Sequence, residues 1–367
     1  MARETTESSK PIACGMVGTG TVAGQWASQV SSVSGAVAYA VASRSESRAQ
    51  TFAQKHGITK AFEGVDAMCA DPAVDVVYVA TPTHTHVEVG RAVLAAGKGL
   101  VCEKPFGRSR AEAQALIDDA READLFCMEA MWMRFNPLVQ KVRRALKDGK
   151  IGEPKTVTAS LGYQKPSASL GRAADGRGAL LAFGCYGLSL ALYLFGTPSQ
   201  VQWAWTPNPQ GGDETAMLTI CYDEHLMTFT CSERATLTNK VRIQGTDGHL
   251  QLNGPFIDAT ELEIVTLSEL GQRSVWERVQ GRIEQVIGPI LGSPSRGRFR
   301  ATTERLSGFR GEVKAVTACV QNGMVESEIM PWTDTLAVHE ILDAATASPS
   351  GTWTPEAADG AVTTEEQ

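Results

Sequence analysis

Positive charge is scarce in this sequence. It has 34 lysines and arginines against 41 aspartates and glutamates, so its formal net charge is −7. A protein that holds nucleic acid or an anionic membrane through its general surface needs that surface to be basic. The composition therefore excludes nucleic acid and membranes as general partners. Any phosphate group that the protein binds must be met by a few local cations.

The sequence also lacks a CxxC pair among its eight cysteines, and its first ten residues lack an apolar core. Scattered cysteines within apolar runs favour buried free thiols in a reducing compartment over a disulfide framework or a zinc site. A polar start without an apolar core is not typical of a signal peptide. We therefore predict a cytoplasmic protein in which residues 1–10 form a disordered tail.

One uncharged run, residues 178–196, is long enough to cross a bilayer as a helix. Its middle contains Gly184, Cys185, Gly187 and Ser189, and no second run pairs with it. We therefore predict a helix buried inside a second domain rather than a membrane span.

The first third of the chain alternates apolar strands with helical stretches. This order is typical of a parallel sheet that is covered by helices. A helix is expected over 87–96, and a capping box of Ser109 with Glu112 opens the next one. The strands are expected at residues 12–17, 36–42, 74–80, 99–102 and 125–128. We expect this sheet to end near residue 130.

After Pro137 the pattern changes to successive strands separated by turn signals, which predicts a mostly antiparallel sheet. Two helices, at 311–322 and 334–347, follow it. The strands are expected at residues 155–161, 201–205, 215–222, 226–232, 240–244 and 249–252. The predicted domains are a nucleotide-binding domain over 11–131, a substrate-binding and oligomerisation α+β domain over 132–354, and an acidic tail over 355–367.

A glycine motif follows the first expected strand and opens a helix. Gly18 permits a tight turn, Gly20 lets the backbone approach a pyrophosphate, and Ala23 allows the helix to pack closely on the strand. The motif predicts a dinucleotide site that includes Thr19, Thr21 and Val22. A glycine-rich turn without a ligand is the alternative.

The end of the second strand bears on the choice of cofactor. Proteins that bind NAD usually carry a carboxylate there for the ribose hydroxyls, whereas this chain has Ser43 and Arg44, with Arg48 one helical turn later. Two guanidinium groups suit the 2′-phosphate of NADP. We predict NADP rather than NAD, and two surface arginines at a solvated helix start are the alternative.

Several motifs together resemble the family of glucose-fructose oxidoreductase, inositol dehydrogenase and rhizopine-catabolism proteins, over nearly the whole chain. Within it the chain is most similar to the branch of dimeric dihydrodiol dehydrogenases and NADP-dependent xylose dehydrogenases. The motifs are Gly18 to Ala23, Ala80-Thr81-Pro82 with His86, Glu103-Lys104-Pro105, Glu129-Ala130-Met131-Trp132 with Arg134-Phe135, Gly178-Ala179-Leu180-Leu181 before Gly184-Cys185-Tyr186, and Glu326-Ser327.

The resemblance implies an α/β fold with an N-terminal Rossmann domain, a doubly wound parallel sheet, and a C-terminal α+β domain with a mostly antiparallel open sheet. It implies an NADP-dependent oxidoreductase that moves a hydride to or from a carbinol or ketone carbon. The substrate would be a sugar, a sugar derivative such as a nucleotide-linked keto-sugar, or a cyclic diol. The expected assembly is a homodimer or homotetramer.

The resemblance also assigns residues. It places Lys104 beside the nicotinamide and makes Tyr186 the acid or base on the reacting hydroxyl. The alternatives without a catalytic role are an exposed lysine at a strand end for Lys104 and a core aromatic on a buried helix for Tyr186. A neighbouring ammonium would favour the phenolate of Tyr186. The cofactor residues that it adds are Thr81, Pro82, His86, Glu103, Lys104, Trp132 and Arg134. For Trp132 and Arg134 a purely structural role in closing the sheet is the alternative.

One position departs from the family. Many members have an aspartate one turn before the Tyr, where this chain has Ala182. Its loss leaves open a ketone reductase that uses Lys104 and Tyr186 alone, a changed substrate, or a non-catalytic relative that acts as a sensor or partner protein. His84 and His86 lack a third metal ligand, so no metal is expected. The arginine-rich stretch 273–305 suggests a solvated insertion, a subunit contact or a patch for a phosphorylated or nucleotide-linked sugar.

Overall fold

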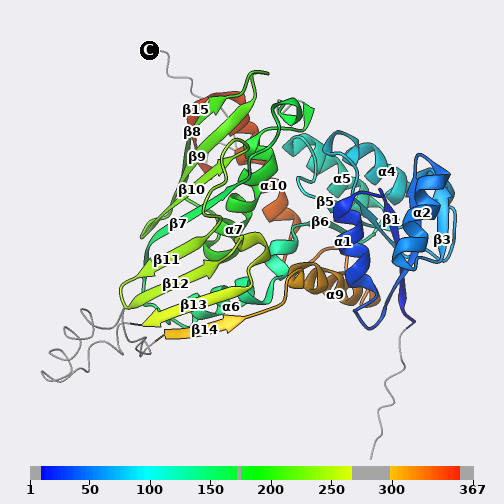
Figure 1. Ribbon diagram of the computed structural model, residues 1–367, viewed down its shortest axis with the longest axis horizontal. Helices are drawn as coiled ribbons and strands as arrows, with labels where there is room; N and C mark the ends of the chain where they lie inside the picture. Colours follow the sequence, from blue (N-terminus) through cyan, green and yellow to red (C-terminus); the bar gives the residue numbers. More distant parts are fainter. Residues whose placement is uncertain (1–9, 172–174, 267–297, 356–367) are drawn as a thin grey trace, which may run out of the picture.

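Two β-sheets, each with its own set of helices, organise the protein (Figure 1). The computed structural model describes residues 10–171, 175–266 and 298–355. The predicted tails therefore lie outside the described residues, apart from Lys10 and Pro355, and so does most of the arginine-rich stretch.

The first sheet has six parallel strands in the order β3-β2-β1-β4-β5-β6. Every residue of β1, β4, β5 and β6 is buried, because helices cover the sheet. The strands are β1 (Ile12–Val17), β2 (Ala36–Ser43), β3 (Lys60–Glu63), β4 (Val76–Val79), β5 (Gly99–Glu103) and β6 (Cys127–Ala130). The helices are α1 (Thr21–Val30), α2 (Glu46–His56), α3 (Val65–Cys69), α4 (His86–Ala95) and α5 (Arg110–Glu122).

The strand order reverses between β1 and β4, because the chain adds β2 and β3 on one side of β1 and β4 to β6 on the other. Ligands of open α/β sheets bind in the crevice at the carboxyl ends of the strands at such a point. This topology confirms the predicted doubly wound sheet. The short strand β3 was not predicted, because its four residues begin with Lys60 and end with Glu63.

The second sheet has nine strands in the order β14-β13-β12-β11-β7-β10-β9-β8-β15. Within the described part of this sheet only β7 and β10 pair in parallel, so the prediction of a mostly antiparallel sheet is confirmed. The strands are β7 (Pro154–Gly162), β8 (Gln200–Pro207), β9 (Asp213–Cys221), β10 (Leu226–Ser232), β11 (Val241–Gly245), β12 (Gly248–Asn253), β13 (Glu261–Thr266), β14 (Arg298–Thr302) and β15 (Ser350–Trp353).

Three strands of this sheet, β13, β14 and β15, were not predicted. They lie toward the two edges of the sheet, where long-range pairing rather than local apolar runs determines the structure. β13 carries Glu261 and Glu263, and β15 consists of Ser350, Gly351, Thr352 and Trp353. Glutamate and glycine are depleted in strands, so the local sequence carries little strand signal.

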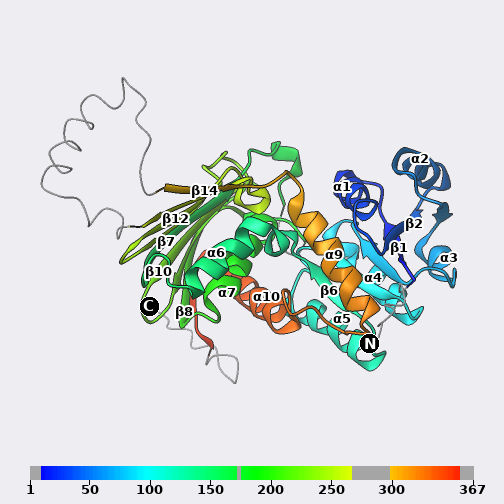
Figure 2. The same cartoon turned by 90° about the horizontal axis from the view of Figure 1, so that it is seen from below.

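Helices cover one face of the second sheet, and within the described residues its other face carries no helix (Figures 1 and 2). The predicted helix over 178–196 is a π-helical turn, Leu180–Gly184, followed by α7 (Cys185–Phe195). A Cβ atom on Gly187 would lie 2.4 Å from Cγ of Phe229, so glycine is what allows α7 to approach β10. No helix in the described chain is long and apolar enough to cross a membrane.

The last two helices connect the two sheets. α9 (Ser307–Gln321) packs on α1, and α10 (Trp332–Ala347) packs on α5 and α7. Figure 2 shows both helices between the two sheets. Both begin earlier than the sequence suggested, α9 at Ser307 and α10 at Trp332. A further helix, α6 (Pro137–Lys147), follows the first sheet directly.

Candidate functional site

The turn between β1 and α1 has the geometry that the glycine motif predicts. Gly18 has φ +112°, and a Cβ atom there would lie 2.5 Å from the carbonyl oxygen of Ala80. Gly20 is the N-cap of α1, and no heavy atom lies within 4 Å of where its Cβ would be. No side chain caps α1. The first-turn N–H groups of α1, which include Thr21 and Val22, therefore face open space, as a phosphate site requires.

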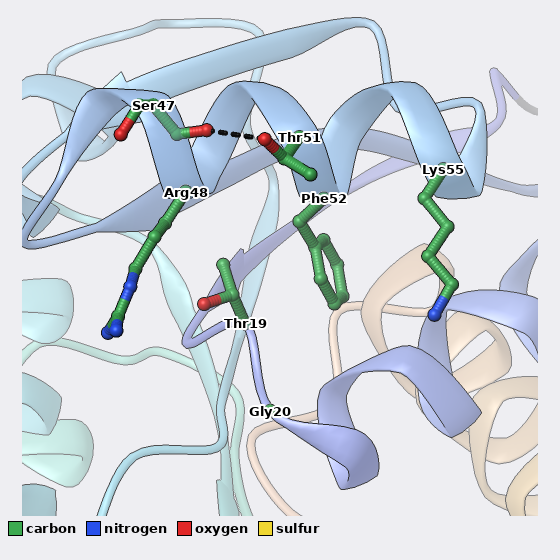
Figure 3. A pocket seen from close by; sticks show the side chains of 7 residues that line it. All are labelled: Thr19, Gly20, Ser47, Arg48, Thr51, Phe52 and Lys55. Carbon is green, nitrogen blue, oxygen red and sulfur yellow. Dashed lines mark hydrogen bonds between the residues drawn. The ribbon is translucent and has the colours of Figure 1, made fainter.

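A pocket lies between this turn and α2 (Figure 3). Arg48 and Lys55 extend from α2 toward opposite ends of the pocket, and Phe52 lies between them. The pocket is lined by Thr19, Gly20, Ser47, Arg48, Thr51, Phe52 and Lys55. Lys55 was not predicted; its spacing of seven residues, or two helical turns, from Arg48 is the signal that identifies it.

Ser43 and Arg44, the other residues predicted to choose the cofactor, do not line this pocket. Ser43 is half-buried at the end of β2, and Arg44 is exposed but does not line the pocket. Neither Arg44 nor Arg48 has a carboxylate partner among the described residues. Both guanidinium groups are therefore available to an anion.

The loop after β4 is held by a buried histidine. His86 is 1% exposed, and its ring nitrogens lie 3.0 Å from the carbonyl oxygen of Pro105 and 2.8 Å from that of Thr81. Burial lowers the pKa of His86, so the neutral ring has one N–H and donates to one of the two carbonyls. His86 thus ties the loop of Thr81 and Pro82 to the loop after β5.

Lys104 follows β5 and reaches across to the second sheet's helices. Its Nζ atom donates to the carbonyl oxygen of Ala182 at 3.0 Å and lies 4.4 Å from the centre of the Tyr186 ring. Burial disfavours the charge of Lys104, but its acidic neighbours Tyr186, Cys185 and Glu103 outweigh this effect and raise the pKa of the ammonium. The structure therefore brings the two predicted catalytic residues together.

Tyr186 lies on the first turn of α7 and is 4% exposed. Nε1 of Trp132 donates a hydrogen bond of 2.9 Å to its hydroxyl oxygen, and the indole stacks on Phe309 with 4.3 Å between ring centres. Burial raises the pKa of Tyr186, while Lys104 acts in the opposite direction. Without a bound cofactor the phenol is therefore protonated at neutral pH, and Trp132 leaves its O–H free to donate elsewhere.

A buried acid lies behind this pair. Glu103 accepts from the hydroxyl of Tyr78 at 2.5 Å and from the backbone N–H of Lys104 at 3.1 Å. Burial raises the pKa of Glu103 to about 7, although Tyr78 and Lys104 lower it. Tyr78 stacks on Trp26 with 4.4 Å between ring centres. Glu103 thus holds the backbone of Lys104 rather than lining the open pocket.

Two more buried glutamates lie in this region. Glu312 on α9 is fully buried, and within the described chain neither carboxyl oxygen has a hydrogen-bond partner. Burial, reinforced by Glu103, raises the pKa of Glu312 well above its usual value. Glu129 accepts from the N–H of Phe106 at 3.1 Å. Glu129 belongs to a motif quoted in the sequence analysis, whereas no local motif marks Glu312, because its burial depends on packing between distant segments.

Arg134 has contacts that fit the structural alternative. Its side chain is fully buried, with Nε donating to Ser189 Oγ at 2.8 Å and a second nitrogen lying 2.5 Å from the carboxylate of Asp334. Two further donors bind the carbonyls of Ile329 and Ser189. Arg134 thus joins α7 to α10, and we do not include it in the proposed cofactor site.

The position of the absent family aspartate is occupied by Ala182, which contributes its carbonyl oxygen to Lys104. The nearest helix-capping carboxylate is Asp213, which accepts from the N–H of Leu180 at 2.5 Å. Asp213 is 2% exposed and caps the π-helical turn. It does not replace the lost side chain, because its oxygens are committed to the helix start.

Metal and disulfide sites are not part of this region. Within residues 10–171, 175–266 and 298–355, no group of three His, Cys, Asp or Glu side chains could hold a metal ion. All eight cysteines are free, and all but Cys221 are buried.

These residues fit a nicotinamide dinucleotide. The glycine turn leaves backbone N–H groups for the pyrophosphate, and the pocket beside α2 carries two cations. Lys104 follows β5, and Tyr186 lies against it from α7. The fold and the site together define a nucleotide-binding oxidoreductase with a parallel dinucleotide-binding sheet and a second, open sheet.

The chain belongs to the Gfo/Idh/MocA oxidoreductase family. Residues 12–131 match the oxidoreductase family with an NAD-binding Rossmann fold, and residues 139–251 match a Gfo/Idh/MocA C-terminal domain. The trans-1,2-dihydrobenzene-1,2-diol dehydrogenase of Bos taurus is 32% identical over 301 residues, which cover 80% of this chain and 83% of the relative. The predicted family and its oxidoreductase activity are thereby confirmed.

Solved structures agree on the fold. A levoglucosan dehydrogenase in complex with NADH and levoglucosan has a TM-score of 0.77 at 19% identity and covers 93% of this chain and 97% of its own. A 3-ketoreductase from Actinomadura kijaniata in complex with TDP-benzene and NADP has a TM-score of 0.72 at 22% identity, with coverages of 91% and 96%.

Proposed function

We propose that this protein is an NADP-dependent oxidoreductase that interconverts a carbinol and a ketone on a sugar, a sugar derivative or a cyclic diol. The observation that carries the proposal is the contact of Lys104 with the Tyr186 ring beside the crevice of the first sheet. The relative named for a cyclic diol supports the substrate class. The proposed catalytic residues are Lys104 and Tyr186.

The bound nicotinamide supplies or accepts the hydride. Tyr186 exchanges the proton on the substrate oxygen, and Trp132 orients the phenol by donating to its oxygen. Lys104, anchored on Ala182, stabilises the phenolate whenever Tyr186 has given up its proton. Tyr186 reaches the substrate from the second sheet, whereas Lys104 is held by the first sheet through the backbone bond to Glu103.

The choice of NADP rests on the α2 pocket. Arg48 and Lys55 line it, Arg44 lies close in sequence, and no carboxylate lines it for the ribose hydroxyls. A 2′-phosphate carries about −1.5 to −2 charges at neutral pH and would be repelled by an acidic side chain at this place. Ser43, Thr19 and Gly20 complete the proposed site, together with Gly18, Thr21, Val22, Thr81, Pro82 and His86.

We propose that Tyr186 is the proton donor when a ketone is reduced and the acceptor when an alcohol is oxidised. A phenol that keeps its proton is a donor, and burial holds the proton on Tyr186. The absence of an aspartate at position 182 removes an additional acceptor that oxidation of an alcohol would use. A purely cofactor-binding sensor would need neither the Lys104–Tyr186 contact nor a phenol with a free proton, and we therefore prefer the enzyme.

The test is a panel of sugars, keto-sugars, inositols and cyclic diols, assayed with NADP and NADPH by the absorbance of the reduced nicotinamide. We expect turnover on hydroxylated rings and a preference for NADP over NAD. Inactivity of the wild type over the whole panel, combined with new activity in Ala182→Asp, would identify a repurposed relative and overturn the assignment.

We further infer a homo-oligomer in a reducing, cytoplasmic setting. The helix-free face of the second sheet exposes Met217 and Leu226, which are 53% and 50% exposed on the adjacent strands β9 and β10. A second copy of the chain suits this face, because the outward residues between Thr215 and Cys221 of β9 and along β10 are uncharged, and such a face can pair with itself about a twofold axis. Met217→Glu should then lower the mass measured by sedimentation equilibrium, and an unchanged mass would contradict this interface.

A further inference from the structure

A cluster of four side chains borders the helix start that carries Tyr186. We call it the rim cluster, and it consists of Tyr163, Lys165, Phe183 and Glu233. The Nζ atom of Lys165 lies 5.0 Å from the centre of the Phe183 ring, and the ring of Tyr163 lies 6.0 Å from that of Phe183. Lys165 also forms an ion pair of 2.5 Å with Glu233. The cluster thus combines two aromatic faces with one ammonium.

Glu233 fixes the position of this ammonium. It is 2% exposed, and its second carboxyl oxygen is buried with no hydrogen-bond partner in the described part of the chain. A buried carboxylate is costly unless it is paired, so the pair with Lys165 is strongly constrained. A backbone hydrogen bond also joins these two residues: the N–H of Lys165 donates to the carbonyl oxygen of Glu233 at 2.7 Å.

The ammonium group of Lys165 has N–H donors that its described contacts do not use. An ammonium group has three N–H donors, and the described contacts of Lys165 use one of them, on Glu233. The side chain is 35% exposed, so the remaining donors are accessible from solvent. A ligand oxygen that lies against Phe183 would meet an ammonium already held in place.

The rim cluster lies beside the proposed catalytic pair. Phe183 directly follows Ala182, whose carbonyl binds Lys104, and it precedes Tyr186 by three residues on the same helix start. Gly176 lies against the loop after β4, where a Cβ on Gly176 would be 3.1 Å from Cβ of Thr83. A substrate whose carbon faces Tyr186 would therefore extend toward Phe183.

Three cations at or near the rim cluster, among the described residues, are paired with carboxylates. Besides the pair of Lys165 with Glu233, Nε of Arg234 lies 3.5 Å from Glu214. Arg305, which is near Tyr163, lies 3.6 Å from Asp258. Each of these three cations thus has a carboxylate partner. A phosphorylated or nucleotide-linked sugar would need unpaired cations, as the α2 pocket has, whereas an uncharged ring would not.

We propose that the rim cluster binds the far side of an uncharged, hydroxylated ring substrate, with Phe183 and Tyr163 against the apolar face of the ring and Lys165 donating to a hydroxyl oxygen remote from the reacting carbon. The inference rests on the proposed function, because it places the reacting carbon at Tyr186. Lys165 is the residue that selects rings with a second hydroxyl, and Glu233 is the positioning residue that holds it.

The test compares Lys165→Met and Glu233→Gln with wild type on matched rings, namely a cyclohexanediol and cyclohexanol with NADP, and their ketones with NADPH. Loss of a charge-assisted hydrogen bond predicts that KM for the diol rises by about ten- to a hundredfold. We expect KM for the mono-alcohol and kcat for both to change less than about threefold. Equal changes for both rings would overturn the proposal. Lys155→Met is the control, since Lys155 lies on β7 and forms an exposed ion pair with Glu153.

Binding measurements separate this inference from the proposed function. Calorimetry of the NADP-loaded protein with the diol should give the same ten- to hundredfold loss in Lys165→Met, whether or not the ring is turned over. An inactive wild type that shows this loss would overturn the proposed function and support the rim cluster. Diol binding that is equal in wild type and Lys165→Met, or preferred binding of a sugar phosphate, would overturn the rim cluster alone.

Discussion

The two ends of the proposed cofactor site, one at α2 and one at Lys104, differ in how exposed their charged groups are. At the α2 end, Arg48 and Lys55 are exposed and have no carboxylate partner among the described residues. At the other end, Lys104 and Tyr186 are packed against each other, and Lys104 also binds a carbonyl oxygen. The cations at the α2 end are exposed to solvent, whereas Lys104 and Tyr186 are shielded from it.

The difference explains what each end is suited to do. An exposed cation attracts a phosphate without a large desolvation cost, but each contact is modest because water screens it. A buried pair is costly to assemble, yet it shifts pKa values strongly and holds a proton at one atom. Substitutions should therefore affect turnover most at the buried end, and cofactor choice most at the exposed end.

The largest effect is expected for Tyr186→Phe, which removes the proposed proton donor and keeps the ring. Turnover should fall by about 10²–10⁴, the usual contribution of acid–base catalysis, while NADP binding stays the same. Single-turnover kinetics and cofactor titration measure the two quantities. Tyr193→Phe on the same helix is the control and should retain activity.

Lys104→Met extends this prediction at the same end. It should lower turnover to a similar degree, and it should also raise the pH of any limb that reports ionisation of Tyr186, because the ammonium favours the phenolate. A pH profile that is unchanged in Lys104→Met would show that the charge of Lys104 does not affect the pKa of Tyr186, and it would contradict the role proposed for the buried end.

An intermediate effect is expected at the exposed end. Arg44→Ala and Arg48→Ala should each weaken NADP binding by about 1.5–3 kcal/mol, the contribution of a hydrogen bond to a charged group, and leave NAD binding nearly unchanged. Fluorescence titration with both cofactors measures this. Arg91→Ala removes an equal charge from an exposed pair on α4 and should change neither affinity. Equal losses for NADP and NAD would contradict the proposed role of the two arginines.

The smallest effect is one of stability, at Glu312. Because burial raises its pKa, the folded protein keeps this proton while the unfolded chain releases it above about pH 4.5. The contribution of Glu312 to the stability of the wild type therefore falls as pH rises above this value, by up to about 1.4 kcal/mol per unit. Glu312→Gln should be more stable than wild type by about 1–3 kcal/mol at pH 7.

Thermal unfolding between pH 5 and 8 checks this prediction. The gain in Tm of Glu312→Gln over wild type should increase steadily with pH. The exposed Glu122→Gln is the control, and its difference from wild type should not grow. A gain that shrinks with rising pH would show that Glu312 is ionised in the folded protein.

The sequence by itself determined the features that are local. The strand β1, the turn at Gly18 and Gly20, and the start of α1 follow from an apolar run and from residues without a Cβ, so their conformation is set within about ten positions of the chain. The strand β10 and the two exposed arginines, Arg44 and Arg48, are also features that the local sequence determines. Each could be predicted because neighbouring residues decide it.

Only the tertiary structure decided the features that depend on burial. The bond from Lys104 to the Ala182 carbonyl joins positions 78 residues apart, and the pair of Lys165 with Glu233 joins positions 68 residues apart. Glu312 is neutral because α9 packs on the first sheet, a fact that no neighbouring residue encodes. Desolvation is set by every atom that surrounds a group. The pKa values and the rim cluster therefore appear only after the two sheets and their helices are assembled.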